Sequence, residues 1–159
     1  DGVPGLGDRL HPRDEVGLVV FSDNVTMVSD IKPAGTISED LSRRVLQLVS
    51  GGGTNLHGAV CRAVEIMKRD EPASGDRLNG IVLLSDGADT TAQISETRMF
   101  QTCLPPTSEV GGAKIFTIAF GTGANVDALD RISHVTGGAA FLASADTIDQ
   151  AYLKISAEQ

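Results

Sequence analysis

The chain has 159 residues, of which 41% are hydrophobic and 21% are charged, as expected for one globular domain with a buried core. Its formal net charge of −8 argues against a general nucleic-acid binder, because such a protein needs a basic face for phosphates. No apolar run is long enough to span a membrane, and no signal-peptide pattern begins at Asp1.

The first third of the chain predicts a β-hairpin followed by a helix. Residues 1–15 are polar and rich in glycine and proline, which predicts a loop or ragged start. Residues 16–21 form an apolar run typical of a buried strand, and the more polar segment 25–31 suits an antiparallel partner at a sheet edge. Ser38, followed by acidic residues, predicts a helix start. The apolar stripe of this helix is Leu41, Val45, Leu48 and Val49, and the glycines 51–53 end it.

Apolar strands alternate with amphipathic helices through the rest of the chain. We expect strands at 81–84, 114–120 and 139–142, and helices at 56–67, 95–103, 126–132 and 148–155. This alternation indicates an α/β fold with a Rossmann-like, mostly parallel sheet, one antiparallel edge strand and helices on both faces. Residues 16–159 are expected to form this single domain.

Candidate ligand residues lie where strands end and helices begin. In such sheets, ligands bind outside the carboxyl ends of the strands. Asp86 follows the strand 81–84, and Thr54 opens a helix. Simpler roles compete, because a threonine at this place can be a helix N-cap and an aspartate before glycine can be a turn residue. Asp89 is expected to be a solvated loop residue, and Asp23 a hairpin-turn residue.

The familiar catalytic and phosphate-binding patterns are missing from the sequence. The glycine run 51–53 has no Gly-Lys-Ser/Thr ending, and Ser85 stands in no Gly-x-Ser-x-Gly motif. His11, His57 and His134 are scattered, without a paired acid or metal-ligand spacing. We therefore predict no catalytic residue and no enzyme.

The chain has two cysteines, Cys61 and Cys103, which are far apart and in no Cys-x-x-Cys arrangement. Zinc or redox chemistry is therefore not indicated. Cys61 falls on the apolar side of a helical segment, which predicts a buried free thiol. A disulfide between the two cysteines is the alternative that the sequence leaves open.

Five segments, in this order and at this spacing, resemble the von Willebrand factor A domain. They are Asp14–Ser22 (DEVGLVVFS), Gly52–Leu56 (GGTNL), Leu83–Gly87 (LLSDG), Ile115–Gly121 (IFTIAFG) and Thr136–Gly138 (TGG). The resemblance covers nearly the whole chain from about Asp14, and bacterial-type members look most similar.

The resemblance implies a metal-ion-dependent adhesion site at the top of the sheet. In that family an Asp-x-Ser-x-Ser motif after the first strand, a threonine in a second loop and an aspartate in a third hold a divalent cation. By motif match, Thr54 is the threonine and Asp86 the aspartate. The expected ion is Mg²⁺ or Mn²⁺, since a hard cation prefers oxygen ligands, and a carboxylate of a partner protein completes the site.

No Asp-x-Ser-x-Ser motif occurs in this sequence, and the nearest match, Asp40–Arg44, ends wrongly within a predicted helix. The resemblance therefore implies an N-terminally truncated domain without its first strand, which would lie between the strands that end at Phe21 and Leu84. We expect the chain alone to bind metal weakly or not at all, because two protein oxygens make a poor magnesium site. The uncovered strand edges favour self-association. Direct pairing of the two strands, strand exchange in a dimer and a retained fragment all remain open.

The leading interpretation is a non-enzymatic protein-interaction or adhesion-type module. Its intact parent would bind the divalent metal and recruit an Asp or Glu carboxylate of a protein partner. The resemblance to bacterial members also allows a regulatory or scaffolding subunit of a chelatase-like ATPase complex. A hydrolase or nucleotide-binding enzyme of the doubly wound class is the third hypothesis, and neither nucleic acid nor a membrane is an expected partner.

Overall fold

The predicted alternation of strands and helices is present in the computed structural model, which describes residues 10–49, 51–70, 79–104 and 113–158. Residues 1–9 of the predicted loop or ragged start lie outside these residues. In chain order the elements are β1 (Glu15–Phe21), β2 (Val25–Pro33), α2 (Ala34–Leu46), α3 (Leu56–Arg69), β3 (Gly80–Ser85), α4 (Glu96–Thr102), β4 (Lys114–Phe120), α5 (Val126–Val135), β5 (Ala140–Ala143) and α6 (Ile148–Glu158).

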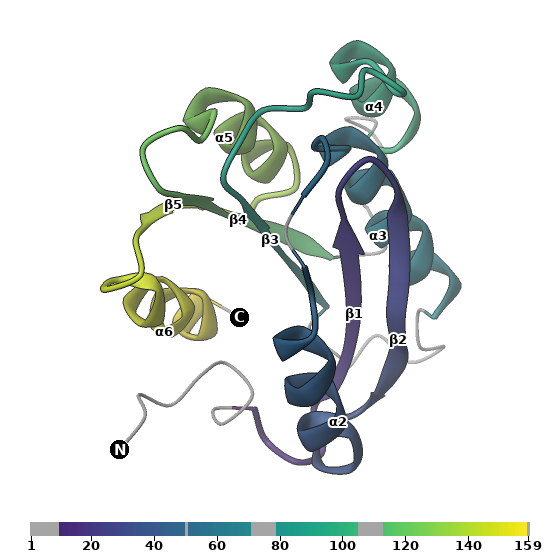
Figure 1. The fold of residues 1–159 in the computed structure, drawn as a ribbon, viewed down its shortest axis with the longest axis vertical. Coiled ribbons are helices and arrows are strands. Elements are labelled where there is room, and N and C mark those ends of the chain that lie inside the picture. Colours follow the sequence, from purple (N-terminus) through teal and green to yellow (C-terminus); the bar gives the residue numbers. More distant parts are fainter. Residues whose placement is uncertain (1–9, 50, 71–78, 105–112, 159) are drawn as a thin grey trace.

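A parallel three-stranded sheet, in the order β3-β4-β5, forms the centre of the molecule. β4 is the middle strand, and its residues from Ile115 to Ala119 are all buried. Helices cover both faces of this sheet (Figure 1), because α3 and α5 pack on one side and α6 packs on the other. The α/β class, the parallel sheet and the helices on both faces are therefore confirmed.

Two hydrophobic cores correspond to the two faces of the sheet. The first joins α3, α4 and α5 to the sheet through Leu56, Val60, Val64, Leu83, Met99, Leu104, Ile115, Ala119, Leu129 and Ile132. The second joins α6 to the sheet through Phe116, Ile118, Ala143, Ala151 and Ile155. The apolar periodicity of α3 therefore marks its buried face as predicted.

The antiparallel hairpin β1–β2 forms a sheet of its own, separate from the parallel sheet. Among the described residues, no ladder joins β1 to β3, so the two strands do not pair directly. Leu84 on β3 is 41% exposed, although the sequence predicts a strand buried on both faces. The physical reason is that no element in the described ranges covers this part of β3.

The helix α2 begins at Ala34, four residues before the predicted start at Ser38. Its first amide groups already have partners, because Ala34 N donates to Asp14 O at 2.7 Å and Gly35 N donates to Pro12 O at 3.1 Å. The helix ends at Leu46, and the predicted apolar stripe is largely exposed towards its end, where Val45 is 47% exposed.

The cysteines Cys61 and Cys103 form a disulfide, with their Cα atoms 5.2 Å apart. The prediction of a free thiol at Cys61 is therefore wrong. The reason is tertiary: α3 and the end of α4 lie side by side, although 42 residues separate the two cysteines. Among the described residues, no helix is both long and apolar enough to cross a membrane.

Candidate metal-binding site

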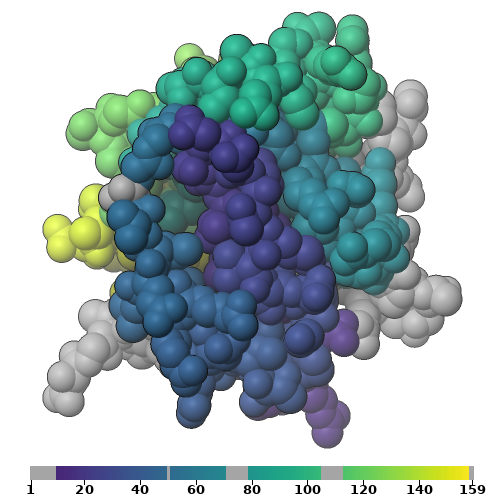
Figure 2. Space-filling view, turned by 45° about the vertical axis from the view of Figure 1, so that its right-hand side comes forward, coloured from purple at the N-terminus to yellow at the C-terminus, as the bar shows by residue number. Residues whose placement is uncertain are grey.

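Three loops meet near the carboxyl ends of β1 and β3 and the start of α3. They are the β1–β2 turn, the glycine loop before α3 and the loop after β3. In Figure 2 the tip of the purple hairpin lies against the blue-green segment that follows β3. Hydrogen bonds join all three, since Gly53 N donates to Asp23 Oδ1 at 2.8 Å and Gln93 Nε2 donates to Asp23 O at 2.9 Å. Asp23 therefore connects the hairpin turn to both other loops.

Thr54 is held by its backbone, and its side-chain hydroxyl is left available. Thr54 N donates to Thr90 Oγ1 at 2.7 Å, and Thr90 N donates to Thr54 O at 2.9 Å. The helix N-cap is the next residue, Asn55, whose Oδ1 accepts from Gly58 N at 3.1 Å. The simpler role of Thr54 as N-cap is therefore wrong. Within the described residues the Thr54 hydroxyl has no hydrogen-bond partner.

Asp86 is exposed at the carboxyl end of β3. The side-chain hydrogen bonds within the turn that follows β3 are not made by Asp86. Those bonds belong to Ser85, which is 5% exposed and whose Oγ donates to Gly87 O at 2.9 Å. In the part of the chain that the structure describes, the Asp86 carboxylate makes no hydrogen bond or ion pair. A carbon added at Gly87 would lie 3.9 Å from Thr54 Oγ1, so the loops of Asp86 and Thr54 are neighbours.

Asp89 is the most firmly bonded acid near the site, with a side chain that is only 5% exposed. Its carboxylate accepts from the backbone N–H groups of His57 at 2.9 Å, Ala92 at 3.0 Å and Thr91 at 3.1 Å. The expectation of a solvated loop residue is therefore wrong. Burial opposes ionisation of Asp89, but the three donated N–H groups outweigh it and hold its pKa below the usual value.

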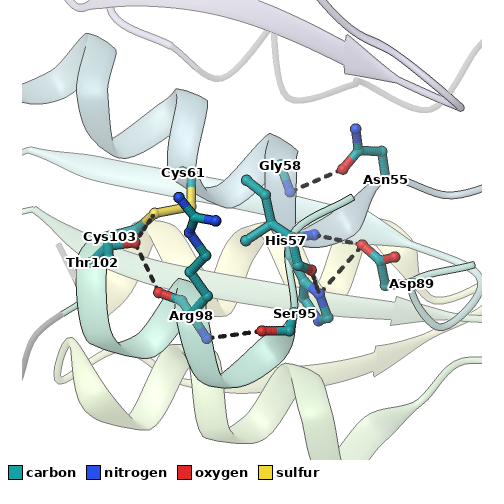
Figure 3. The surroundings of a disulfide bond; sticks show 10 residues. Asn55, His57, Gly58, Cys61, Asp89, Ser95, Arg98, Thr102 and Cys103 are labelled. Atoms are coloured by element: carbon teal, nitrogen blue, oxygen red, sulfur yellow. Dashed lines mark hydrogen bonds and ion pairs between the residues drawn. A yellow bond between two sulfur atoms is a disulfide. The ribbon is translucent and has the colours of Figure 1, made fainter. Parts of the chain in front are cut away.

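His57 joins the first turn of α3 to the loop after β3 (Figure 3). Its Nδ1 lies 2.7 Å from Ile94 O, so Nδ1 carries a proton and donates, and it lies 3.5 Å from Asp89 Oδ2. A structural role for His57 therefore agrees with its surroundings. Asp89 also places negative charge at the N-terminus of α3, where the helix dipole is positive. The positive potential at the N-terminus of α3 would disfavour a cation beside Thr54, and the negative charge of Asp89 offsets that potential.

The available oxygens suit a hard divalent cation but fill only part of its shell. A threonine hydroxyl and a carboxylate are ligands that Mg²⁺ prefers, and Mg²⁺ normally needs near-octahedral geometry. Among the described residues, no group of three or more His, Cys, Asp or Glu side chains could hold a metal ion. Asp89 and Asp23 are close by, but both carboxylates already accept backbone N–H groups. Thr54 and Asp86 therefore form a partial site.

The sequence patterns did not predict that Asp89, Thr90 and His57 hold the loop after β3 against the start of α3. A local signal for Asp89 was present, because Asp followed two residues later by Thr often forms a side-chain turn. The contact that buries Asp89 comes from His57, 32 residues away, and has no local pattern.

The fold and the loops define an α/β domain with oxygen ligands at the carboxyl edge of its strands. The family model for the von Willebrand factor type A domain matches residues 6–88, so the chain belongs to this family. The resemblance found in the sequence is thereby confirmed. Family membership supports a protein-interaction or adhesion module, since these domains are generally non-enzymatic.

Comparisons with individual proteins agree with this assignment. Calcium-activated chloride channel regulator 1 of the pig (Sus scrofa) is 31% identical over 124 residues, which are 77% of this chain and 12% of the relative. The chain thus spans about an eighth of the length of that relative. Among solved structures, the von Willebrand factor type A protein from Catenulispora acidiphila has a TM-score of 0.77 at 16% identity, over 96% of this chain and 35% of that one.

A third similar protein has zinc in its own metal-ion-dependent adhesion site (MIDAS) motif. Proximal thread matrix protein 1 of the mussel byssus, with a zinc-occupied MIDAS motif, has a TM-score of 0.64 at 16% identity. The match covers 94% of this chain and 37% of that one. At this identity the likeness shows the fold alone.

Proposed function

We propose that this chain is a protein-interaction module in which Thr54 and Asp86 supply two oxygens to a divalent cation. The cation then binds a carboxylate, from Asp or Glu, of a partner protein. One observation carries the proposal: both side chains lie on neighbouring loops and make no hydrogen bond within the described residues. Neighbouring residues take over the local structural roles, because Asn55 caps α3 and Ser85 bonds the turn after β3.

The cation is proposed to be Mg²⁺ or Mn²⁺. Both prefer oxygen ligands, and an exposed carboxylate with a hydroxyl leaves positions for water and for the partner. The zinc in the MIDAS motif of the mussel protein supports a cation at this place in the fold, without deciding its identity. With two protein oxygens, the chain by itself is expected to bind either ion weakly.

The remaining protein ligands are proposed to arrive with a strand that pairs with β1 and β3. Both strands have a free edge within the described residues, because β1 pairs there with β2 alone and β3 with β4 alone. The exposed Leu84 on β3 would be covered by such a strand. A second copy of the chain that pairs through the same edges would give self-association instead.

Titration calorimetry with Mg²⁺ and Mn²⁺, on the wild-type chain and on Asp86→Ala, tests this function. A matched control is Asp30→Ala, which makes the same change of charge near Arg69, the last residue of α3. Since α3 has 14 residues, this control lies about 20 Å from Thr54. We expect weak, saturable binding that is lost in Asp86→Ala and kept in Asp30→Ala. Equal binding by all three proteins would refute a site at Asp86.

A further inference from the structure

The disulfide Cys61–Cys103 connects α3 to the segment that leaves the candidate metal site. Cys61 lies on α3, and Cys103 is the residue that follows the last turn of α4. Figure 3 shows the bond between the two helices, with His57 further along α3 and Asp89 of the loop after β3 beside it. The chain from Asp86 to Cys103 is therefore fixed to one helix at both of its ends.

The helix α4 depends on tertiary contacts for its position. It has seven residues, and an isolated helix of this length is not stable in water. Met99 and Leu104, both 0% exposed, anchor it in the first core. The ion pair between Arg131 and Glu96, at 2.6 Å, lies on a partly exposed surface and contributes little. The covalent link at Cys103 is thus one of few anchors at the end of α4.

The other end of the segment is tied to the same helix by hydrogen bonds. His57, on α3, bonds to Asp89 and Ile94, and Thr54, just before the helix, bonds to Thr90. His57 and Cys61 are four residues apart, so they lie on the same face of α3. The residues between Asp86 and Ser95 form no helix or strand, so they are held by these hydrogen bonds, by that of Gln93 to Asp23 and by the packing of Ile94 on the first core. The disulfide fixes the far end of the segment at Cys103.

We propose that the Cys61–Cys103 disulfide is a redox-controlled link that fixes the segment 86–104 on α3. The oxidised form keeps the loop of Asp86 beside Thr54 and binds the cation more tightly, and the reduced form loosens this segment. Only the effect of the disulfide on cation affinity rests on the proposed function; its effect on the position of the segment 86–104 does not.

The chemical step is ordinary thiol–disulfide exchange with a cellular dithiol. A thiolate of the dithiol attacks one cysteine sulfur, the S–S bond breaks, and the second thiol of the dithiol resolves the mixed disulfide. Two electrons and two protons pass to this chain, which ends with two thiols, while the dithiol becomes a disulfide. The reverse reaction restores the link.

Amide hydrogen exchange of the oxidised and reduced wild-type chain tests the link without any metal. After reduction we expect exchange within 90–92 and 99–103 to accelerate by about tenfold or more, while β4 changes by less than about twofold. Ile155→Ala, in the second core on the other face, is the control for a general loss of stability. Unchanged exchange across 86–104 would overturn the proposal. Exchange that accelerates equally in all elements, as in Ile155→Ala, would also overturn it. The disulfide would then stabilise only the fold as a whole and would not specifically restrain the segment 86–104.

The cation part is measured on the wild type and on the double variant Cys61→Ser/Cys103→Ser, with no reductant present. Binding of Mn²⁺ can be followed by water-proton relaxation, which detects weak sites, and we expect about fivefold weaker binding in the variant. By reciprocity, saturating Mn²⁺ should shift the equilibrium with a glutathione buffer towards the disulfide, by the ratio of its affinities for the oxidised and the reduced chain. Equal affinities would refute the coupling. If neither protein binds Mn²⁺, the proposed metal function fails, and hydrogen exchange still decides whether the bond holds the segment.

Discussion

The backbone N–H of His57 donates to Asp89 Oδ2 at 2.9 Å, so a buried carboxylate fastens the loop after β3 to the first turn of α3. Together with the hydrogen bonds between Thr54 and Thr90, this contact positions the two residues proposed to bind the cation, because Thr54 precedes α3 and Asp86 begins the loop. A carboxylate at a helix N-terminus is also favoured by the helix dipole. The position of the candidate site therefore depends on an acid that is not itself a ligand.

The substitution Asp89→Asn should destabilise the domain and change its response to acid. Asparagine keeps the shape but loses the negative charge that accepts three backbone N–H groups, so we expect a loss of about 1–3 kcal/mol at neutral pH. Urea denaturation measures the change. Asp30→Asn is the matched control, because its exposed side chain lies 4.0 Å from Arg69 and should matter little.

The pH dependence follows from the direction of the pKa shift of Asp89. Its folded-state pKa lies below the unfolded value, so its contribution is fully present above about pH 4 and is lost as the pH falls through the folded pKa. We expect the wild type to lose stability in this acid range more steeply than Asp89→Asn. Parallel curves for the two proteins would contradict the assignment.

Thr54 and Asn55 are adjacent, but a substitution at Thr54 should lower cation affinity, whereas a substitution at Asn55 should lower the stability of the fold. Thr54→Val removes a hydroxyl that has no partner within the described residues, so stability should change by less than about 0.5 kcal/mol. Any cation affinity should fall by about tenfold or more, because a ligand is lost. Asn55→Ala removes the N-cap and two donated bonds, and should cost about 1–3 kcal/mol.

Thermal unfolding and Mn²⁺ titration of the two variants separate these roles. If Thr54→Val proves as destabilising as Asn55→Ala, the threonine is a structural residue and the metal proposal loses its main support.

The turn before β5 depends on a close approach that only glycine permits. A Cβ at Gly138 would overlap the carbonyl oxygen of Ile115 on β4. Thr136 Oγ1 holds the two segments together by accepting from Ile115 N at 2.9 Å. Gly138→Ala should therefore cost about 3 kcal/mol or prevent folding. Gly137→Ala is the control: it has a φ of +74° but open space around it, and should cost about 1–2 kcal/mol. Equal losses in denaturant would contradict this distinction.

Local patterns in the sequence predicted what local chemistry determines. The apolar runs located β3 and β4, and the family resemblance assigned Thr54 and Asp86 to two loops, which the structure places next to each other. The errors come from contacts between distant residues. Helix α2 starts early because the carbonyl of Asp14 accepts the N–H of Ala34. Cys61 and Cys103 form a bond because two helices 42 residues apart in sequence pack together, and no periodicity contains that information.

The exposed edge of β3 should control self-association. Leu84 is 41% exposed on a strand whose second edge has no partner within the described residues. Pairing of this edge with another copy would bury Leu84, so Leu84→Lys should disfavour it, because edge lysines oppose strand pairing. Leu142→Lys is the matched control: Leu142 is 68% exposed on β5, at the opposite edge of the same sheet.

Sedimentation velocity over a range of concentrations distinguishes the two edges. If Leu84→Lys is monomeric where the wild type and Leu142→Lys associate, the interface lies at β3. Because the same edge would receive a completing strand, a synthetic apolar peptide that binds the wild type should then bind Leu84→Lys more weakly. Dissociation by Leu142→Lys alone would instead locate the interface at β5, and the edge between β1 and β3 would lose its proposed role in self-association.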